Sequence, residues 1–451
     1  MQFELSLEYI NHLKNAIAER NDAYLKEQLQ ELYAVDIALI LNRLDLDESI
    51  YLYDQIEEGL TADVLLEMEE EKREALLATF STKEIAEQLD NMESDDAADV
   101  INELPEEIQE EVLSQIEDIE QASDIANLMS FEEGTAGSLM AKELVSVYAH
   151  ETVSACIDEI RRQTDNVDVM YAIYVVDDHD KLIGMLSLKK LIISHPLALV
   201  EEIYDADVIS VKTSASSEEV AELIQKYDLV VLPVIDQLGR LVGRITIDDV
   251  VDVMREEAEK DIQLMSGITD DVDSNDGLWR LSRARIPWLL IGMGGGIIGS
   301  RIIGSYEGQI QIHPEMAFFI PLIGATGGNV GVQSSSIIVQ GLANNTLITD
   351  RIAPKLFKEL GVGLINGIIC SSLILGYNLL ISETWTLAAT VSIALFTVVI
   401  CASFLGTFVP LTMNRFNVNP ALATGPFVTT LNDIIGISIY FLVGHLLYSV
   451  F

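Results

Sequence analysis

Hydrophobic and polar residues are distributed in three different ways along the chain of 451 residues. Up to about residue 132, apolar residues recur at helical steps of three or four, with Asp and Glu between them. From about residue 137 to residue 256, β-branched runs alternate with helical stretches. After about residue 279, long apolar stretches dominate. The pattern therefore predicts a multidomain protein with an all-α domain, an α/β domain and a membrane domain.

An internal repeat marks the first region. Three apolar triplets with helical steps follow one another at a spacing of 24 residues, and a fourth triplet lies half a period later. Two short helices per repeat are typical of a helical stack in which each unit buries its face on the next. We therefore predict an acidic superhelical domain over residues 1–132. The triplets are Ala38-Leu41-Leu44, Ala62-Leu65-Met68, Ala86-Leu89-Met92 and Ala98-Ile101-Leu104.

The second region contains two copies of a strand, a turn with Asp, a strand and a helix. IYVVDDHDKLIGMLSLKKLI begins at Ile173 and aligns with LPVIDQLGRLVGRITIDDVV, which begins at Leu232. This repeat resembles the cystathionine-β-synthase-type (CBS) regulatory module, which works as a tandem pair. The resemblance implies a tandem CBS domain over residues 133–250, with modules at about 137–198 and 200–250. The alignment pairs Asp177 with Asp236, Leu182 with Leu241 and Gly184 with Gly243.

An acidic linking helix is predicted over residues 251–278, and five apolar stretches follow it. Each stretch is close to the ~20 residues that cross a bilayer as a helix. Arg285 precedes the first stretch, Arg351 lies between the second and third, and Arg415 lies between the fourth and fifth. Since the other two loops contain no Lys or Arg, we predict a five-helix membrane domain over residues 279–451, with the N-terminus cytoplasmic and the C-terminus extracellular. The stretches are roughly 286–304, 314–341, 356–381, 386–412 and 421–449.

The charge is strongly negative and unevenly distributed. The chain has 72 acidic and 27 basic residues, of which only six acidic and eight basic ones lie after residue 279. The part before this point therefore has a net charge near −47. This excess argues against nucleic acid and against docking on anionic lipids, and it favours bound cations. The first residues, MQFELSLEYI, do not resemble a signal peptide. The three cysteines and six histidines show no ligand spacing, and no GxSxG, P-loop or HExxH motif occurs, so we do not expect an enzyme.

Asp433 is a carboxylate in the middle of the last apolar stretch. A charge at this depth costs about 2.5–3.5 kcal/mol on insertion scales, so such acids usually line ion paths, although one bonded to a neighbouring helix is the alternative. Pro420 is predicted in the first helical turn, and Pro426 is predicted to loosen the helix before Asp433. One Asp is too little for a dehydrated Mg²⁺ cage, but a symmetric dimer would supply two carboxylates to a hydrated ion. Polar neighbours are Thr429, Thr430 and Asn432.

The second apolar stretch has a small and polar face around Gly327, Gly328 and Asn329. One interpretation is close packing between helices, which small residues permit. The other is a pore wall, in which a distorted helix at Gly327-Gly328 presents backbone carbonyls and the Asn329 amide to water or an ion.

These features together resemble the MgtE-type Mg²⁺ channels over essentially the whole chain. The resemblance rests on the acidic helical domain, the tandem CBS modules, the linking helix, the TGGN segment and the P-A-L…P-x-x-x-T-x-x-D final stretch. It implies a homodimer with a pore between two membrane domains and Asp433 as the selectivity acid. It also implies that intracellular Mg²⁺ bridges the acidic domains and the linking (plug) helix and thereby shuts the pore.

The resemblance also implies a set of sensor carboxylates. Asp95 and Asp99 lie four residues apart on one predicted helix, for which Ser94 is the predicted cap. Lys260 stands where the family has an acid, which alters one sensor site. Any one of these acids can instead belong to a solvated helix face, but together they repel one another unless cations intervene. The matching positions are Asp95, Asp99, Glu218, Asp228, Asp249, Asp252 and Asp261.

The leading hypothesis is a Mg²⁺-selective channel of the plasma membrane that mediates Mg²⁺ uptake and is closed by intracellular Mg²⁺. One alternative is a secondary transporter that exchanges divalent cations such as Mg²⁺ or Co²⁺ for H⁺ or Na⁺. Another is a membrane sensor of Mg²⁺ or nucleotide that transports nothing. Because CBS pairs often bind adenine nucleotides, ATP is an expected ligand of the CBS domain.

Overall fold

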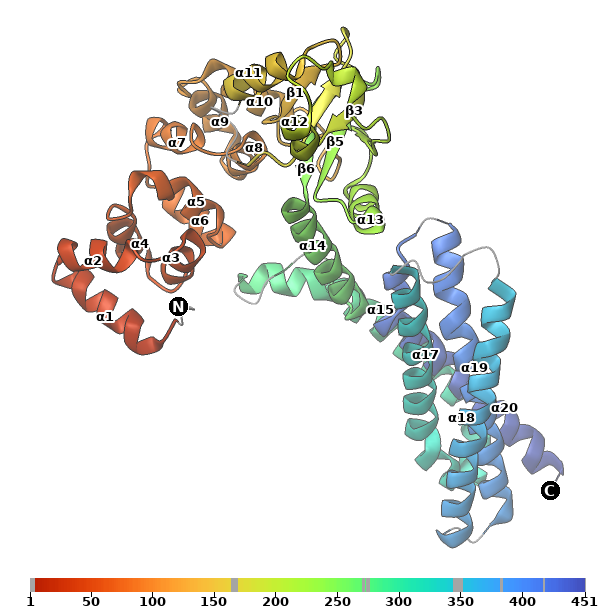
Figure 1. Ribbon diagram of the computed structural model, residues 1–451. Helices are drawn as coiled ribbons and strands as arrows, with labels where there is room; N and C mark the ends of the chain where they lie inside the picture. The colour runs from red at the N-terminus through yellow and green to blue at the C-terminus, as the bar shows by residue number, and fades with distance from the viewer. Residues whose placement is uncertain are drawn as a thin grey trace. The chain divides into compact units, whose positions relative to one another are not determined.

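The computed structural model describes residues 5–163, 169–269, 272, 276–343, 352–381, 384–416 and 418–450. The chain divides into two compact units, Met1–Met254 and Arg255–Phe451. Short helices and two small sheets form the first unit, and long helices form the second (Figure 1). Arg351, on which the predicted topology partly rests, lies outside the described residues.

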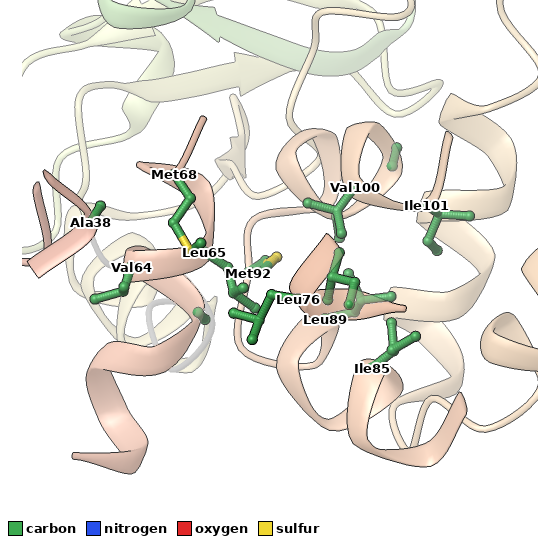
Figure 2. Close-up of a cluster of buried hydrophobic side chains, with 14 of the residues drawn as sticks. Ala38, Val64, Leu65, Met68, Leu76, Ile85, Leu89, Met92, Val100 and Ile101 are labelled. Atoms are coloured by element: carbon green, nitrogen blue, oxygen red, sulfur yellow. The ribbon is translucent and has the colours of Figure 1, made fainter. Parts of the chain in front are cut away.

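The N-terminal part of the first unit is a stack of short helices, as the repeat predicts. Helix N-termini are fixed locally, since Asp45 and Ser81 each form a capping box with the Glu three residues later. Every residue of the four predicted triplets is buried, and Figure 2 shows part of this core, with Leu65, Leu89 and Ile101 among its members. The helices are α1 (Leu7–Ala18), α2 (Asp22–Leu29), α3 (Ala34–Leu41), α4 (Leu46–Tyr53), η1 (Glu58–Leu60), α5 (Thr61–Leu66), α6 (Glu70–Leu77), α7 (Thr82–Leu89), α8 (Ser94–Glu103), α9 (Glu106–Leu113) and α10 (Ile119–Leu128).

Two three-stranded sheets follow, with orders β1-β2-β3 and β4-β5-β6. In each sheet the first pair of strands is parallel and the second pair antiparallel, and both antiparallel pairs shift register near their turn end. The elements are β1 (Val145–Tyr148), α11 (Val153–Gln163), β2 (Ile173–Val176), β3 (Leu182–Leu186), α12 (Leu188–Ile193), η3 (Val200–Glu202), β4 (Val211–Lys212), α13 (Ser217–Tyr227), β5 (Val231–Ile235) and β6 (Leu241–Thr246).

The paired sequence positions have the same role in both sheets. Asp177 Oδ1 accepts hydrogen bonds from the backbone N–H groups of His179 and Lys181, and Asp236 Oδ1 closes the second turn in the same way. Gly184 is needed because a Cβ there would lie 2.1 Å from Tyr204 Cδ2. The predicted α/β repeat is therefore confirmed, and its second copy shares one hydrophobic core with the helical stack.

The second unit consists mainly of long helices that run beside one another (Figure 1). Four of them, α15, α18, α19 and the α20 region, are long and apolar enough to span a membrane. The remaining predicted stretch, the second (314–341), forms α17 over most of its length; this helix has 24 residues but is more polar because of its Gly, Ser, Asn and Gln. A count of five spans therefore stays a prediction. The elements are α15 (Leu278–Ser305), α16 (Glu307–Ile312), η4 (Pro314–Phe319), α17 (Ile320–Ala343), α18 (Ile352–Ile381), α19 (Trp385–Arg415), η5 (Pro420–Ala423) and α20 (Gly425–Val450).

Several local predictions need correction. Pro420 begins η5 and not the last long helix, which starts at Gly425 with a φ of +49°. Pro426 therefore lies in the first turn of α20, where its missing N–H costs nothing, and it does not loosen a helix interior. The predicted loop after the first stretch contains α16, and the predicted second stretch begins with η4 before α17.

The linking helix also differs in extent from its prediction. Helix α14 (Ile247–Met265) begins within the predicted second CBS module and ends well before residue 278. The domain limits given above otherwise stay predictions.

Candidate cation sites

A cavity of about 490 Å³ lies among α15, α17 and α20 and contains the Asp433 side chain. Its polar lining consists of Ser300, Asn329, Thr429, Thr430 and Asp433. The rest of its lining consists of six apolar side chains and six glycines, which are Gly292, Gly295, Gly296, Gly299, Gly324 and Gly328. A carboxylate, an amide and hydroxyl groups among apolar helices are the combination that attracts a hydrated cation.

The glycines of α17 make room for the carboxylate. A Cβ on Gly324 would lie 3.3 Å from Asp433 Oδ1, and a Cβ on Gly328 would lie 3.2 Å from Thr429 Cγ2. On the facing helix, a Cβ on Gly295 would lie only 2.0 Å from Thr430 Cγ2. The three helices can therefore approach one another while Asp433 still faces open space.

Not all predicted pore residues line this cavity. Gly328, Asn329, Thr429, Thr430 and Asp433 do. By contrast, Gly327 faces Val398 of α19, and Asn432 is 2% exposed and lies against Gly331. Pro420 and Pro426 lie at the starts of η5 and α20, outside the lining.

The two interpretations of the second stretch are partly reconciled. Helix α17 continues through Gly327 and Gly328, so the distortion proposed for a pore wall is not present in this described helix. The glycines serve close packing, while Asn329 nevertheless faces the cavity. The glycines of α15 were missed, although the run GMGGGIIGS, with its small residues at helical spacing, could have indicated them.

The first unit contains a cluster of carboxylates where α8 meets the second CBS module. Ligand oxygens of Glu93, Asp95 and Glu143 lie within 4.8 Å of one another, close enough for one metal ion. Asp95 is 8% exposed, and its Oδ1 has no hydrogen-bond partner among the described residues. A buried acceptor without a donor is the kind of group that a bound cation would satisfy.

The acids of this cluster disfavour one another's ionisation. Burial raises the pKa of Asp95 well above its usual value, and the neighbouring Asp96, Asp249 and Glu93 raise it further. Burial, with Asp249 and Glu93 nearby, also raises the pKa of Asp96 to about 7. The pKa values of Asp249 and Glu93 are raised as well, again mainly by burial. A divalent cation among these groups would offset both their desolvation and their repulsion.

Hydrogen bonds fix the geometry of the cluster. Ser94 is the first residue of α8 and not its cap, which is Glu93. The Ser94 hydroxyl donates to Glu143 Oε2 at 3.0 Å, and the Ser94 backbone N–H donates to Glu143 Oε1 at 3.1 Å. Asp249 Oδ2 accepts from Thr246 at the start of α14. Sequence reasoning missed Glu93, Asp96 and Glu143, although the acidic run ESDD pointed to the first two.

The other predicted sensor acids are dispersed. Asp99 is exposed on α8 and contributes to the negative charge around Arg73, and Asp252 is exposed on α14. Glu218 and Asp228 lie at opposite ends of α13, both exposed. In the second unit, Asp261 Oδ1 accepts a hydrogen bond from Asn419 Nδ2 at 3.2 Å. Only Asp95 and Asp249, of the predicted set, are brought together in the described structure.

Lys260, where the family pattern has an acid, lies next to Asp261. Its Nζ forms an ion pair with Glu257 Oε1 at 3.4 Å, one turn earlier on α14. Both side chains are partly exposed to solvent, so the pair itself adds little stability.

Comparisons with known families agree with this arrangement. Residues 320–443 match the family described as "Divalent cation transporter" (MgtE). Residues 32–134 match the MgtE intracellular N domain, and residues 136–194 and 200–256 match CBS domains.

Similar proteins include magnesium transporters named MgtE. The chain is 38% identical to that of Thermus thermophilus over 326 residues, which are 71% of each chain. It is 32% identical to that of Enterococcus faecalis over 314 residues, covering 70% of this chain and 69% of the relative. A crystal structure of the cytosolic domain of the Mg²⁺ channel MgtE in complex with ATP aligns with a TM-score of 0.51 at 32% identity, over 54% of this chain and 99% of that one.

Proposed function

This chain belongs to the MgtE family of magnesium transporters, and we propose that it is a Mg²⁺-selective channel of the plasma membrane. Members of the family are transport proteins and not enzymes, and this chain is a multi-pass membrane protein with an intracellular N domain. Mg²⁺ would enter through it passively, driven by the membrane potential, and the C-terminus would be extracellular.

The observation that carries the proposal is the single carboxylate of Asp433 in a glycine-lined cavity among the long helices. In a homodimer with the pore on its axis, two such carboxylates would face the same ion. Mg²⁺ gives up water reluctantly, so the two groups would hold it through its water shell. Asn329, Thr429 and Thr430 would contact the remaining water molecules.

Intracellular Mg²⁺ would close this channel through the cytoplasmic acids. The carboxylates around Asp95 and Asp249 are buried together and repel one another, so a divalent cation would stabilise the packed arrangement. A ligand that favours the packed state shifts the population toward it as its concentration rises. The other proposed sensor acids are Asp99, Glu218, Asp228, Asp252 and Asp261, which would bind Mg²⁺ between parts of the closed dimer.

Uptake into proteoliposomes tests the pore. With an inside-negative potential and H⁺ and Na⁺ gradients collapsed by ionophores, wild-type protein should take up Mg²⁺, and Asp433→Ala should not. Glu307→Gln removes an exposed acid outside the cavity and should transport as wild type does. Intact uptake by Asp433→Ala would refute the role of this residue, and uptake that requires an H⁺ or Na⁺ gradient would favour an exchanger.

ATP would bind the paired CBS modules. The relative's cytosolic domain was crystallised with ATP, and in this chain the two modules contact each other through backbone bridges at Lys181 and Arg240. Isothermal titration calorimetry with ATP on the full chain tests this, and an absence of binding with and without Mg²⁺ would contradict it.

A further inference from the structure

Arg244 is a buried cation inside the acidic cluster. It lies on β6 of the second CBS module, where its backbone N–H and C=O pair with Ala141, and its side chain is almost fully covered. A buried guanidinium is costly unless it is paired and hydrogen-bonded. The groups that contact Arg244 must therefore offset the cost of burying its charge.

Those partners come from two other parts of the unit. Arg244 Nη2 donates to Glu93 Oε1 at 2.6 Å, and Glu93 caps helix α8 of the helical domain. Arg244 Nε donates to the backbone carbonyl oxygen of Glu143, and the guanidinium carbon lies 5.4 Å from the centre of the Tyr171 ring. The side chain therefore links the second CBS module to the start of α8.

The positive charge of Arg244 neutralises only part of the cluster. Glu93, Asp95, Asp96, Glu143 and Asp249 surround this junction. Arg244 Nη2 donates to Glu93, while the buried Arg244 Nη1 and Asp95 Oδ1 each lack a hydrogen-bond partner among the described residues. An unpartnered buried carboxylate oxygen and an excess of negative charge thus remain beside the guanidinium.

We propose that Arg244 is a tethered cation that holds the start of α8 against the second CBS module before Mg²⁺ binds. Mg²⁺ then binds to acids that are already held together and partly neutralised by Arg244. A lower Mg²⁺ concentration is therefore enough to stabilise α8 against the second CBS module. Arg244 is a positioning residue here, since it acts on the acids and not on the transported ion. This inference rests on the proposed sensing function, but its test measures docking and not transport.

Hydrogen–deuterium exchange on the full chain in detergent tests the proposal. Exchange in peptides from α8 reports whether α8 is docked on the second CBS module, and exchange in peptides from β5 and β6 reports whether that module is folded. Mg²⁺ is added stepwise to protein in buffer that has been treated with EDTA. Arg244→Met should lose α8 protection in Mg²⁺-free buffer and should need about tenfold more Mg²⁺ to regain it, a typical size for coupling between sites. Arg240→Met is the matched control, because Arg240 is exposed and pairs with Asp236 in the same hairpin.

Glu93→Gln provides a second variant that leaves the CBS module unchanged. In Mg²⁺-free buffer it should expose α8 as Arg244→Met does, and the double variant should be no worse than either single one. The proposal is overturned if Arg244→Met gives the wild-type α8 curve, or if β5 and β6 stay unprotected at saturating Mg²⁺. It is also overturned if the two single effects simply add. Transport could fail in every variant, including wild type, without changing these outcomes.

Discussion

At the scale of single residues, carboxylates occupy two contrasting environments. Asp433 faces a cavity kept open by glycines, whereas Asp95 is buried beside Glu93 and Glu143. In the proposed mechanism the first environment passes a hydrated ion, because no other acid lines that cavity among the described residues. The second retains an ion, since several acids converge there.

Enlarging Gly324 should obstruct the ion path. In Gly324→Ala the new methyl group would lie about 3.3 Å from Asp433 Oδ1 and narrow the space for hydrated Mg²⁺. We expect a several-fold loss of Mg²⁺ uptake with normal expression and thermal stability. Gly294→Ala is the control, because no atom beyond its chain neighbours and the backbone of its own helix lies within 4 Å of its Cβ position. Equal uptake by both variants would show that Gly324 does not border the path.

Binding of Mg²⁺ to the acidic cluster should release protons. The pKa of Asp96 is raised from 3.8 to about 7, so this group is partly protonated at neutral pH in the packed state. Asp96 binds its proton more tightly when α8 is packed against the second CBS module than when the two are apart. Without Mg²⁺, the equilibrium constant for this packing should therefore increase roughly tenfold as the pH falls from about 8 to about 6.

Calorimetry in buffers of different ionisation enthalpy measures this release. At pH 7, Mg²⁺ binding should release roughly half a proton from Asp96, since the metal favours the charged form. Asp96→Asn should lower the release by that amount, whereas Asp90→Asn should not, because Asp90 lies on the half-buried turn after α7 and accepts a hydrogen bond from the backbone N–H of Glu117. A release that is unchanged in Asp96→Asn would contradict the assigned environment.

At the scale of elements, glycine allows the helices around the cavity to approach closely. Gly295 of α15 meets Thr430 of α20, and Gly331 of α17 meets Asn432. In a membrane, packing of this kind replaces the hydrophobic effect as the force that holds helices together. Helix contact and cavity therefore depend on the same small residues.

Gly295→Ala should separate α15 from α20. Its Cβ would lie 2.0 Å from Thr430 Cγ2, and overpacking of this kind typically costs about 1–3 kcal/mol. We expect a lower midpoint of thermal unfolding in detergent and reduced transport. Gly294→Ala should leave the midpoint unchanged or raise it slightly, because Ala favours helix. Matching midpoints for the two variants would exclude a tight α15–α20 contact.

The sequence predicts elements well where a periodic pattern forces burial. The Ala38, Ala62 and Ala86 triplets identify the helical stack, and Asp177 and Asp236 identify both CBS turns. The start of α20 was misplaced because Pro420 is compatible with either a 3-10 or an α-helical first turn. Gly425, with its positive φ, separates the two helices, and its role depends on a tertiary contact with the Met265 carbonyl.

At the scale of the whole molecule, the sequence identifies the pore acid more readily than the sensor. Asp433 stands out because a lone charge in an apolar stretch needs only local sequence to be noticed. The junction of Glu93, Glu143 and Arg244 joins segments up to 151 residues apart, and no local pattern brings them together. Acids such as Glu218 and Asp252 are exposed in a single chain, so their predicted role depends on further binding partners.

The central claim is a Mg²⁺ conductance that intracellular Mg²⁺ closes. Recording Mg²⁺ current from inside-out membrane patches, with the cytoplasmic face held first at low and then at high Mg²⁺, tests it most directly. Wild-type current should be large at low Mg²⁺ and fall at high Mg²⁺, and the Asp95→Asn/Asp249→Asn variant should need more Mg²⁺ to close. Current that does not respond to cytoplasmic Mg²⁺, or that persists in Asp433→Ala, would contradict the account.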